Sequence, residues 1–186
     1  LIPYFRKGPR LNARSYLYFA AIGFAYMAIE LILMQKYTLL VGPSVNSVAA
    51  ILITMLIGSG VGSRFSKHFT IQTVFMVILG WLILDIIFFK VIISIFGDGG
   101  KVFRIMVTMI LVAPLGFFMG MPFPMGVKRV GPLVDWGFAV NGAASVLGST
   151  LTILVVISYG FSIGLILAML VYGGAYLLLR SDSLAP

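Results

Sequence analysis

Long hydrophobic runs, separated by short connectors that carry glycine, proline or charge, make up most of this chain. A helix needs about 20 predominantly apolar residues to cross the hydrocarbon core of a bilayer. The runs reach that length, so the pattern predicts six transmembrane helices and an all-α membrane bundle. We place the spans at Ser15–Lys36, Ser44–Ser63, Thr70–Phe96, Val102–Val127, Leu133–Ile157 and Phe161–Leu179.

The composition supports this reading. The chain is 61% hydrophobic and only 10% charged, whereas soluble domains carry about 25% charged residues. We divide it into a basic cytoplasmic lead-in (1–14), the six-helix domain (15–180) and a cytoplasmic tail (181–186). The chain starts at Leu1 and shows no cleavable signal pattern, so we expect a fragment of a longer chain.

Lysine and arginine are distributed unevenly between the two sides of the predicted bundle. Nine lie on the side of the N-terminus and four on the other, which by the positive-inside rule places both termini in the cytoplasm. We therefore expect a multi-pass membrane protein. The nine are Arg6, Lys7, Arg10, Arg14, Arg64, Lys67, Lys128, Arg129 and Arg180, and the four are Lys36, Lys90, Lys101 and Arg104.

Residue types that carry catalytic or metal chemistry are scarce. There is no cysteine, and the single histidine, His68, lies in a basic connector. We therefore expect no metal site and no cofactor, and we find no catalytic set of residues. The net charge of +8 lies in the connectors, so we expect lipid rather than nucleic acid as the partner.

Polar residues inside the spans mark the candidate site. Glu30 lies in the first span, somewhat beyond its middle, and a carboxylate at that depth is costly unless it is paired, protonated or solvated. Asn141, Ser145 and Ser149 repeat every four residues and form a polar stripe on the fifth span. The stripe either bonds a neighbouring helix or lines a cavity, and it offers Glu30 a partner. Our candidate intramembrane site is Glu30, Gln35, Asn141 and Ser145.

A second carboxylate, Asp85, lies in the third span. We expect it to form a structural ion pair with Lys90, one turn away, or with Lys101 or Arg104.

Small residues recur at the four-residue spacing that lets transmembrane helices approach closely. We expect helix-packing faces at these positions, with the second and fifth spans in the interior of the bundle. The positions are Gly58 and Gly62, Gly116 and Gly120, and Ala144 and Gly148.

Prolines interrupt the fourth span. Pro114 lies inside it, and Pro122 and Pro124 flank Phe123 near its cytoplasmic end. Each proline removes a backbone donor, so we expect a kink or an unwound segment. Broken transmembrane helices occur where they are buried in protein or line a cavity, and a simple packing kink is the alternative.

Several segments together resemble the membrane-embedded part of the bacterial fused spermidine synthase-like proteins. The match covers nearly the whole chain in order. The matching segments are Gly23–Glu30 with Gln35, Leu40–Pro43, Gly58–Ser63, Gly120–Gly126, Trp136, Asn141–Ser149 and Gly160-Phe161. The basic loop Gly62–Lys67 also resembles the loop at this position in major facilitator transporters, which are built from six-helix units.

The first resemblance implies a domain of the bacterial inner membrane, joined to a soluble aminopropyltransferase-like or methyltransferase-like domain elsewhere in the full protein. Its role would be to anchor or assemble that catalytic domain or a larger membrane complex. The alternative is a transporter-like half-bundle that moves a cationic substrate such as a polyamine, with other membrane helices supplying the second half. In either case Glu30 is expected first as a buried, hydrogen-bonded carboxylate and second as a ligand site.

Overall fold

Six helices are long and apolar enough to cross a membrane, which confirms the predicted multi-pass architecture. The computed structural model describes residues 11–180, except the side chain of Pro132, and shows no strand in that range. Residues 1–10 of the expected lead-in (1–14) and the whole expected tail (181–186) lie outside the described residues. The first helix already begins at Ala13, inside the expected lead-in. The elements are α2 (Ala13–Val41), α3 (Val45–Phe65), α4 (Ile71–Phe96), α5 (Lys101–Met119), α6 (Pro122–Val130), a short 3-10 turn (Gly131–Leu133), α7 (Val134–Tyr159) and α8 (Phe161–Arg180).

The first helix is longer than predicted. It continues past Lys36 to Val41 and ends at Gly42, whose φ of 96° requires a residue without a Cβ. The Gly42 N–H donates to the Thr38 carbonyl at 2.8 Å, which closes the last turn. Lys36 consequently lies within the helix rather than at its end.

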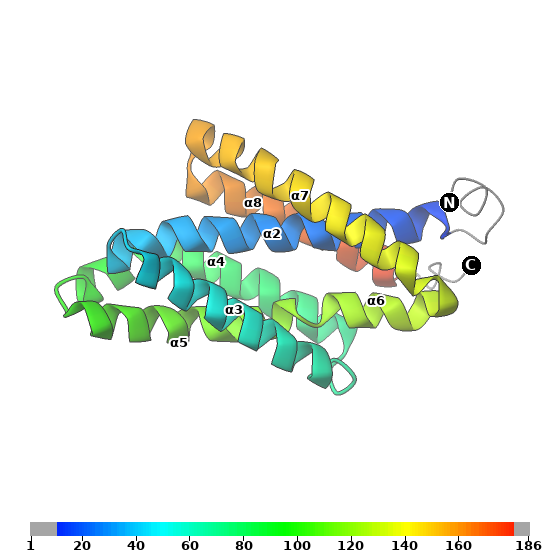
Figure 1. Ribbon diagram of the computed structural model, residues 1–186, viewed down its shortest axis with the longest axis horizontal. Coiled ribbons are helices and arrows are strands. Elements are labelled where there is room, and N and C mark those ends of the chain that lie inside the picture. Colours follow the sequence, from blue (N-terminus) through cyan, green and yellow to red (C-terminus); the bar gives the residue numbers. More distant parts are fainter. Residues whose placement is uncertain (1–10, 181–186) are drawn as a thin grey trace.

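Helix α2 forms the centre of the bundle (Figure 1). It packs most extensively against α7 and α8, while α3 pairs with α5, and α4 contacts α8 and α5. More than half of its most apolar window is buried (56%), compared with 28% for α3 and 17% for α7. The prediction that the second and fifth spans are interior is therefore wrong. Small residues let one face of α3 and α7 approach a neighbour closely, but their other faces remain uncovered.

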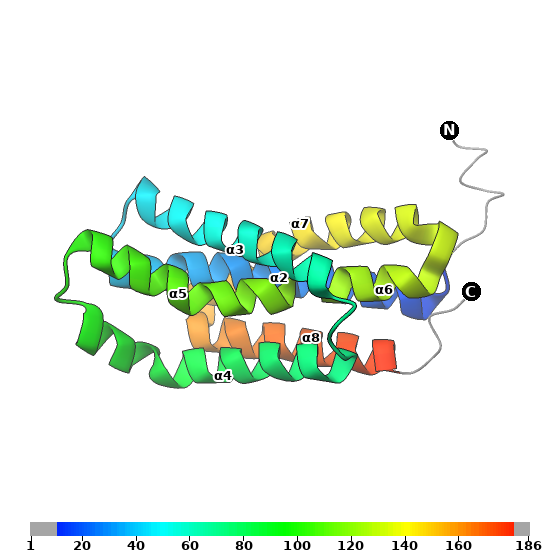
Figure 2. The same cartoon turned by 90° about the horizontal axis from the view of Figure 1, so that it is seen from below.

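The fourth span consists of two helices, α5 and α6, joined at Gly120 and Met121 (Figure 2). Pro122 opens α6, whereas Pro114 lies inside α5 without ending it. The Tyr18 hydroxyl donates to the Pro122 carbonyl at 2.5 Å and ties the junction to α2. In both views the junction lies well inside the bundle, away from the helix ends (Figures 1 and 2).

The start of α2 and the end of α8 lie at the same end of the bundle (Figures 1 and 2). The α6–α7 corner lies at that end too. The connections α2–α3 and α4–α5 lie at the opposite end. This arrangement is the one expected for an even number of membrane crossings.

Candidate functional site

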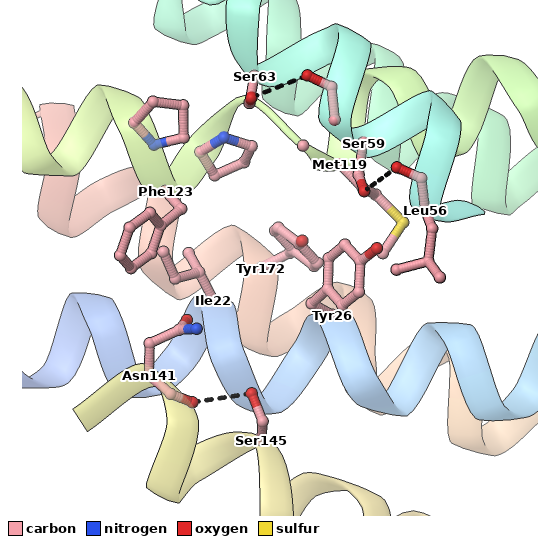
Figure 3. A pocket seen from close by; sticks show the side chains of 14 residues that line it. Ile22, Tyr26, Leu56, Ser59, Ser63, Met119, Phe123, Asn141, Ser145 and Tyr172 are labelled. Carbon is pink, nitrogen blue, oxygen red and sulfur yellow. Dashed lines mark hydrogen bonds between the residues drawn. The ribbon is translucent and has the colours of Figure 1, made fainter. Parts of the chain in front are cut away.

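A pocket of about 360 Å³ lies where α5 gives way to α6 (Figure 3). We call it the central pocket. Six helices (α2, α3 and α5–α8) and Gly120 at the α5–α6 junction supply its walls, and the side chains labelled in Figure 3 surround one common space. The lining residues are Ile22 and Tyr26 of α2; Leu56, Ser59, Gly60 and Ser63 of α3; Met119 and Gly120 where α5 ends; Pro122, Phe123 and Pro124 of α6; Asn141 and Ser145 of α7; and Tyr172 of α8.

Close contact between α3 and α5 forms one wall of the central pocket. A Cβ at Gly62 would overlap the Phe117 carbonyl, and one at Gly120 would overlap the Ser59 carbonyl. Gly58 and Gly116 make the next contacts along the same seam, where an added Cβ would lie 3.1 Å from Phe117 N and 3.2 Å from Met55 Cα, respectively. These glycines therefore set the distance between the two backbones.

Close contact between α2 and α7 forms the opposite wall. An added Cβ at Gly23 would lie 2.7 Å from the Asn141 side-chain oxygen, and one at Gly148 would lie 2.6 Å from the Phe24 carbonyl. Ala144 is buried on the same face of α7. The polar residues of α7 are thereby brought against α2 at the level of the central pocket.

The serine hydroxyls of the central pocket donate to carbonyls of their own helices. Ser59 donates to Leu56 at 3.2 Å, Ser63 to Gly60 at 3.0 Å and Ser145 to Asn141 at 2.8 Å. A hydroxyl has one hydrogen and two lone pairs, so each of these oxygens keeps acceptor capacity. These hydroxyls therefore present acceptors rather than donors to an occupant.

Two polar side chains of the central pocket make no hydrogen bond to any described residue. The Tyr172 hydroxyl belongs to a residue that is only 1% exposed, and the Asn141 side-chain amide faces the same space (Figure 3). Among the described residues the one fully buried polar side-chain atom without a partner is Arg104 Nε, so these two groups instead border the open space of the pocket, where water or an occupant can bond them. The central pocket is therefore a place where an occupant would gain hydrogen bonds.

Glu30 lies on α2 one turn beyond Tyr26 and is only 5% exposed. Its carboxylate makes no hydrogen bond or ion pair with any described residue, although it interacts electrostatically with Tyr26. The expected pairing of Glu30 with the Asn141–Ser145 stripe is not formed. The Ser145 hydroxyl, which donates to Asn141, lies 3.2 Å from the Gly23 carbonyl oxygen, and Gly23 precedes Glu30 on α2 by nearly two turns. The carboxylate lies next to the pocket without lining it.

Gln35 does not join this group. It is partly exposed and lies more than two turns beyond Tyr26 on α2. Of the four residues of the predicted site, the structure thus brings Asn141 and Ser145 together in the pocket wall, places Glu30 beside it and leaves Gln35 outside.

A buried ion pair lies apart from the central pocket. Lys36 Nζ lies 2.5 Å from Asp85 Oδ2 and 3.0 Å from the Asp85 carbonyl oxygen, and the Tyr37 hydroxyl donates to Asp85 Oδ1 at 2.8 Å. The ammonium also lies 4.3 Å from the centre of the Phe89 ring. The prediction that Asp85 pairs with Lys90, Lys101 or Arg104 is wrong. Lys90 is exposed, and Arg104 donates to the Leu40 carbonyl.

Sequence reasoning missed Lys36 because it placed the end of the first helix there. Five further residues of helix carry the chain to Val41, and this puts Lys36 among buried side chains. It also missed Tyr26 and Tyr172, since aromatic residues in an apolar span are not distinguishable by pattern from core residues. Tyr26 and Tyr172 both line the central pocket only because of how α2 and α8 are rotated and because the fourth span breaks at Gly120.

Comparison with protein-family models finds no match, nor does comparison with curated proteins or with solved structures. Among the described residues, no group of three or more His, Cys, Asp or Glu side chains could hold a metal ion.

Proposed function

We propose that the chain is a membrane domain that binds an organic cation in the central pocket, as half of a transporter-like bundle. The observation that supports this most directly is the position of the pocket at a helix break. In secondary transporters, substrate and ion sites are typically built at interrupted helices inside the membrane. Here the helix break and the unpartnered side chains of Asn141 and Tyr172 line the same pocket. The buried carboxylate of Glu30 lies one turn of α2 beyond Tyr26, which also lines it.

The lining favours a cation over an anion. None of the described residues that line the central pocket is basic, whereas Tyr26, Tyr172 and Phe123 supply aromatic rings. A cation is attracted to the faces of aromatic rings, and the serine oxygens supply acceptors. Glu30, one turn from Tyr26, would supply the opposite charge.

The helix break itself is a poor anion site. A helix N-terminus usually binds anions through its free N–H groups. Pro122 and Pro124 occupy the first turn of α6 and have no N–H, so most of those donors are missing. Because Pro124 cannot donate, the Gly120 carbonyl also lacks its ordinary helical partner. The junction is therefore richer in acceptors than in donors, as a cation requires.

The proposed substrate class, a polyamine or similar amine, comes from the resemblance to spermidine synthase-like proteins. Four of the segments that carry this resemblance supply residues to the central pocket. They are Gly23–Glu30, Gly58–Ser63, Gly120–Gly126 and Asn141–Ser149. Their meeting at one pocket supports a common ligand-binding role for them.

A second candidate function is anchoring and assembly of a soluble catalytic domain or a larger complex. The observation in its favour is that α2 begins and α8 ends at the same end of the bundle (Figure 1). A soluble domain joined at either end would lie on that side, which the charge distribution assigns to the cytoplasm of a bacterial inner membrane. Purification of the full protein without any attached domain or partner would count against this role.

The cation-binding proposal is tested by equilibrium binding of radiolabelled spermidine to the full chain in lipid nanodiscs. Glu30→Gln should weaken binding by at least about tenfold, because losing a buried charge pair costs more than about 1.4 kcal/mol. Tyr172→Phe should weaken it by a smaller factor, since only one hydrogen bond is lost. The matched control is Asp98→Asn, which removes an exposed carboxylate from the α4–α5 connection.

Equal affinities of Glu30→Gln and Asp98→Asn would refute the role of Glu30. The absence of saturable spermidine binding to the unmodified chain would refute the substrate class and leave assembly as the better explanation.

A further inference from the structure

A second pocket, of about 260 Å³, is lined by residues of the α3–α4 connection, the start of α4 and helix α6. We call it the basic groove. The α3–α4 connection lies toward the same end of the bundle as the α6–α7 corner (Figure 2). Three cationic side chains line the basic groove: Lys67 from the α3–α4 connection, and Lys128 and Arg129 from the last turn of α6. Residues some 60 positions apart in the sequence are thus brought to one site.

None of these cations forms an ion pair within the described residues. Lys67 and Lys128 are exposed, and the Arg129 guanidinium is held by donating to the Leu179 carbonyl at the end of α8. No acidic residue lines the basic groove. The positive charge gathered there is therefore not neutralised by the described part of the chain.

A buried hydroxyl also lines the basic groove. Ser66 is only 5% exposed, and its side chain makes no hydrogen bond to a described residue, although its backbone N–H donates to the Ser63 carbonyl. The groove also reaches Ile71, the first residue of α4, where the backbone N–H has no helical acceptor. These groups are donors that an anion would use.

The remaining lining is apolar and consists of Phe69, Ile71 and Met125. Basic side chains beside an apolar wall suit a molecule that has an anionic head and a hydrocarbon body. The site also lies near a helix end of the bundle, where a transmembrane protein meets the lipid headgroups. Basic pockets between transmembrane helices at this level are typical headgroup sites.

We infer that the basic groove binds the phosphate headgroup of an anionic phospholipid, with an acyl chain lying along Phe69 and Met125. Lys67, Lys128 and Arg129 contact the phosphate, and Ser66 donates a hydrogen bond to it. Free phosphate has the same charge chemistry, but it would leave the apolar wall uncovered. This inference does not depend on the cation proposed for the central pocket.

The test is native mass spectrometry of the full chain in detergent with added phosphatidylglycerol. Lys67→Gln/Lys128→Gln should lower the occupancy of bound phosphatidylglycerol by about tenfold or more, given about fivefold for each charge near a headgroup. The control is Lys90→Gln/Lys101→Gln, which removes two exposed lysines from near the other end of the bundle. This control should bind the lipid as the unmodified chain does.

Two further measurements identify the chemical class of the ligand. Phosphatidylcholine has a phosphate but no net charge and should bind much more weakly than phosphatidylglycerol. Inorganic phosphate in excess should not displace the lipid. The inference is overturned if both double variants bind phosphatidylglycerol equally, if phosphatidylcholine binds as well, or if inorganic phosphate competes fully.

Discussion

The ammonium of Lys36 lies 2.5 Å from a carboxylate oxygen of Asp85, which joins α2 to α4 inside the bundle. Both side chains are nearly inaccessible, at 5% and 3% exposure. Removing two charges from water is costly, and the additional contacts with the Asp85 carbonyl, the Tyr37 hydroxyl and the Phe89 ring offset part of that cost. Because α4 packs against α8 and α5 rather than along α2, the pair is a side-chain link that ties α4 to the central helix.

Removing one member of this pair should destabilise the protein strongly. Lys36→Met leaves Asp85 buried without a cation, and breaking such a pair costs about 3–5 kcal/mol. We expect a clearly lower midpoint of thermal unfolding in detergent. The control is Lys90→Met on α4, where the exposed side chain should have little effect.

The double variant Lys36→Met/Asp85→Leu removes both charges and should be more stable than either single variant. If instead the stability losses of the two single variants simply add in the double variant, Lys36 and Asp85 do not interact, and the ion pair is refuted.

The glycines between α3 and α5 should not tolerate even a methyl group. Gly62→Ala places a Cβ on the Phe117 carbonyl and Gly120→Ala places one on the Ser59 carbonyl, and neither backbone can move easily. We expect a loss of about 1–3 kcal/mol for each, by the usual cost of overpacking. Thermal unfolding measures this, with Gly142→Ala on α7 as the control, because a Cβ there meets nothing within 4 Å. A Gly62→Ala protein as stable as Gly142→Ala would contradict the close contact.

The two prolines at the start of α6 should keep the fourth span broken. In Pro122→Ala/Pro124→Ala the missing N–H groups return, so the helix can continue through Gly120. We expect slower amide hydrogen exchange at Met119, Gly120, Met121, Phe123 and Met125, the neighbouring residues that have an amide hydrogen in both proteins, and weaker spermidine binding, because the central pocket depends on the break. Pro114→Ala is the control, since α5 already continues through Pro114. Unchanged exchange at the junction would show that Gly120 and Met121 maintain the break without the prolines.

The number and approximate positions of the spans were predictable from the sequence because each is a long apolar run between polar connectors. Which helix lies at the centre was not. The spacing of Gly58 and Gly62 indicates that a face is closely packed, but it says nothing about the opposite face of the same helix. Helix α2 carries fewer small-residue repeats, yet it is the most buried because large side chains such as Tyr18 and Phe19 fill the core around it.

The candidate site was predictable only in part, for a related reason. Asn141 and Ser145 stand out as polar residues in an apolar span, and the structure places both in the wall of the central pocket. The partner of Asp85 depends on how far the first helix runs and how it is rotated toward α4. The predicted end of the first helix, at Lys36, is five residues too early. A residue at a helix end is expected near the membrane surface, so the prediction did not place Lys36 inside the bundle beside Asp85.

The orientation of the bundle can be measured directly because the chain has no cysteine. His68→Cys and Asp98→Cys each add one thiol to an exposed connector, the first between α3 and α4 and the second between α4 and α5. These connectors lie at opposite ends of α4, and therefore on opposite sides of the membrane. If the excess of basic residues faces the cytoplasm, a membrane-impermeant maleimide should label Asp98→Cys in intact cells and His68→Cys only after lysis. The unmodified chain is the control and should remain unlabelled. The reverse pattern would place the basic groove at the outer leaflet and would rule out cytoplasmic anchoring of a catalytic domain at either end of the described helices.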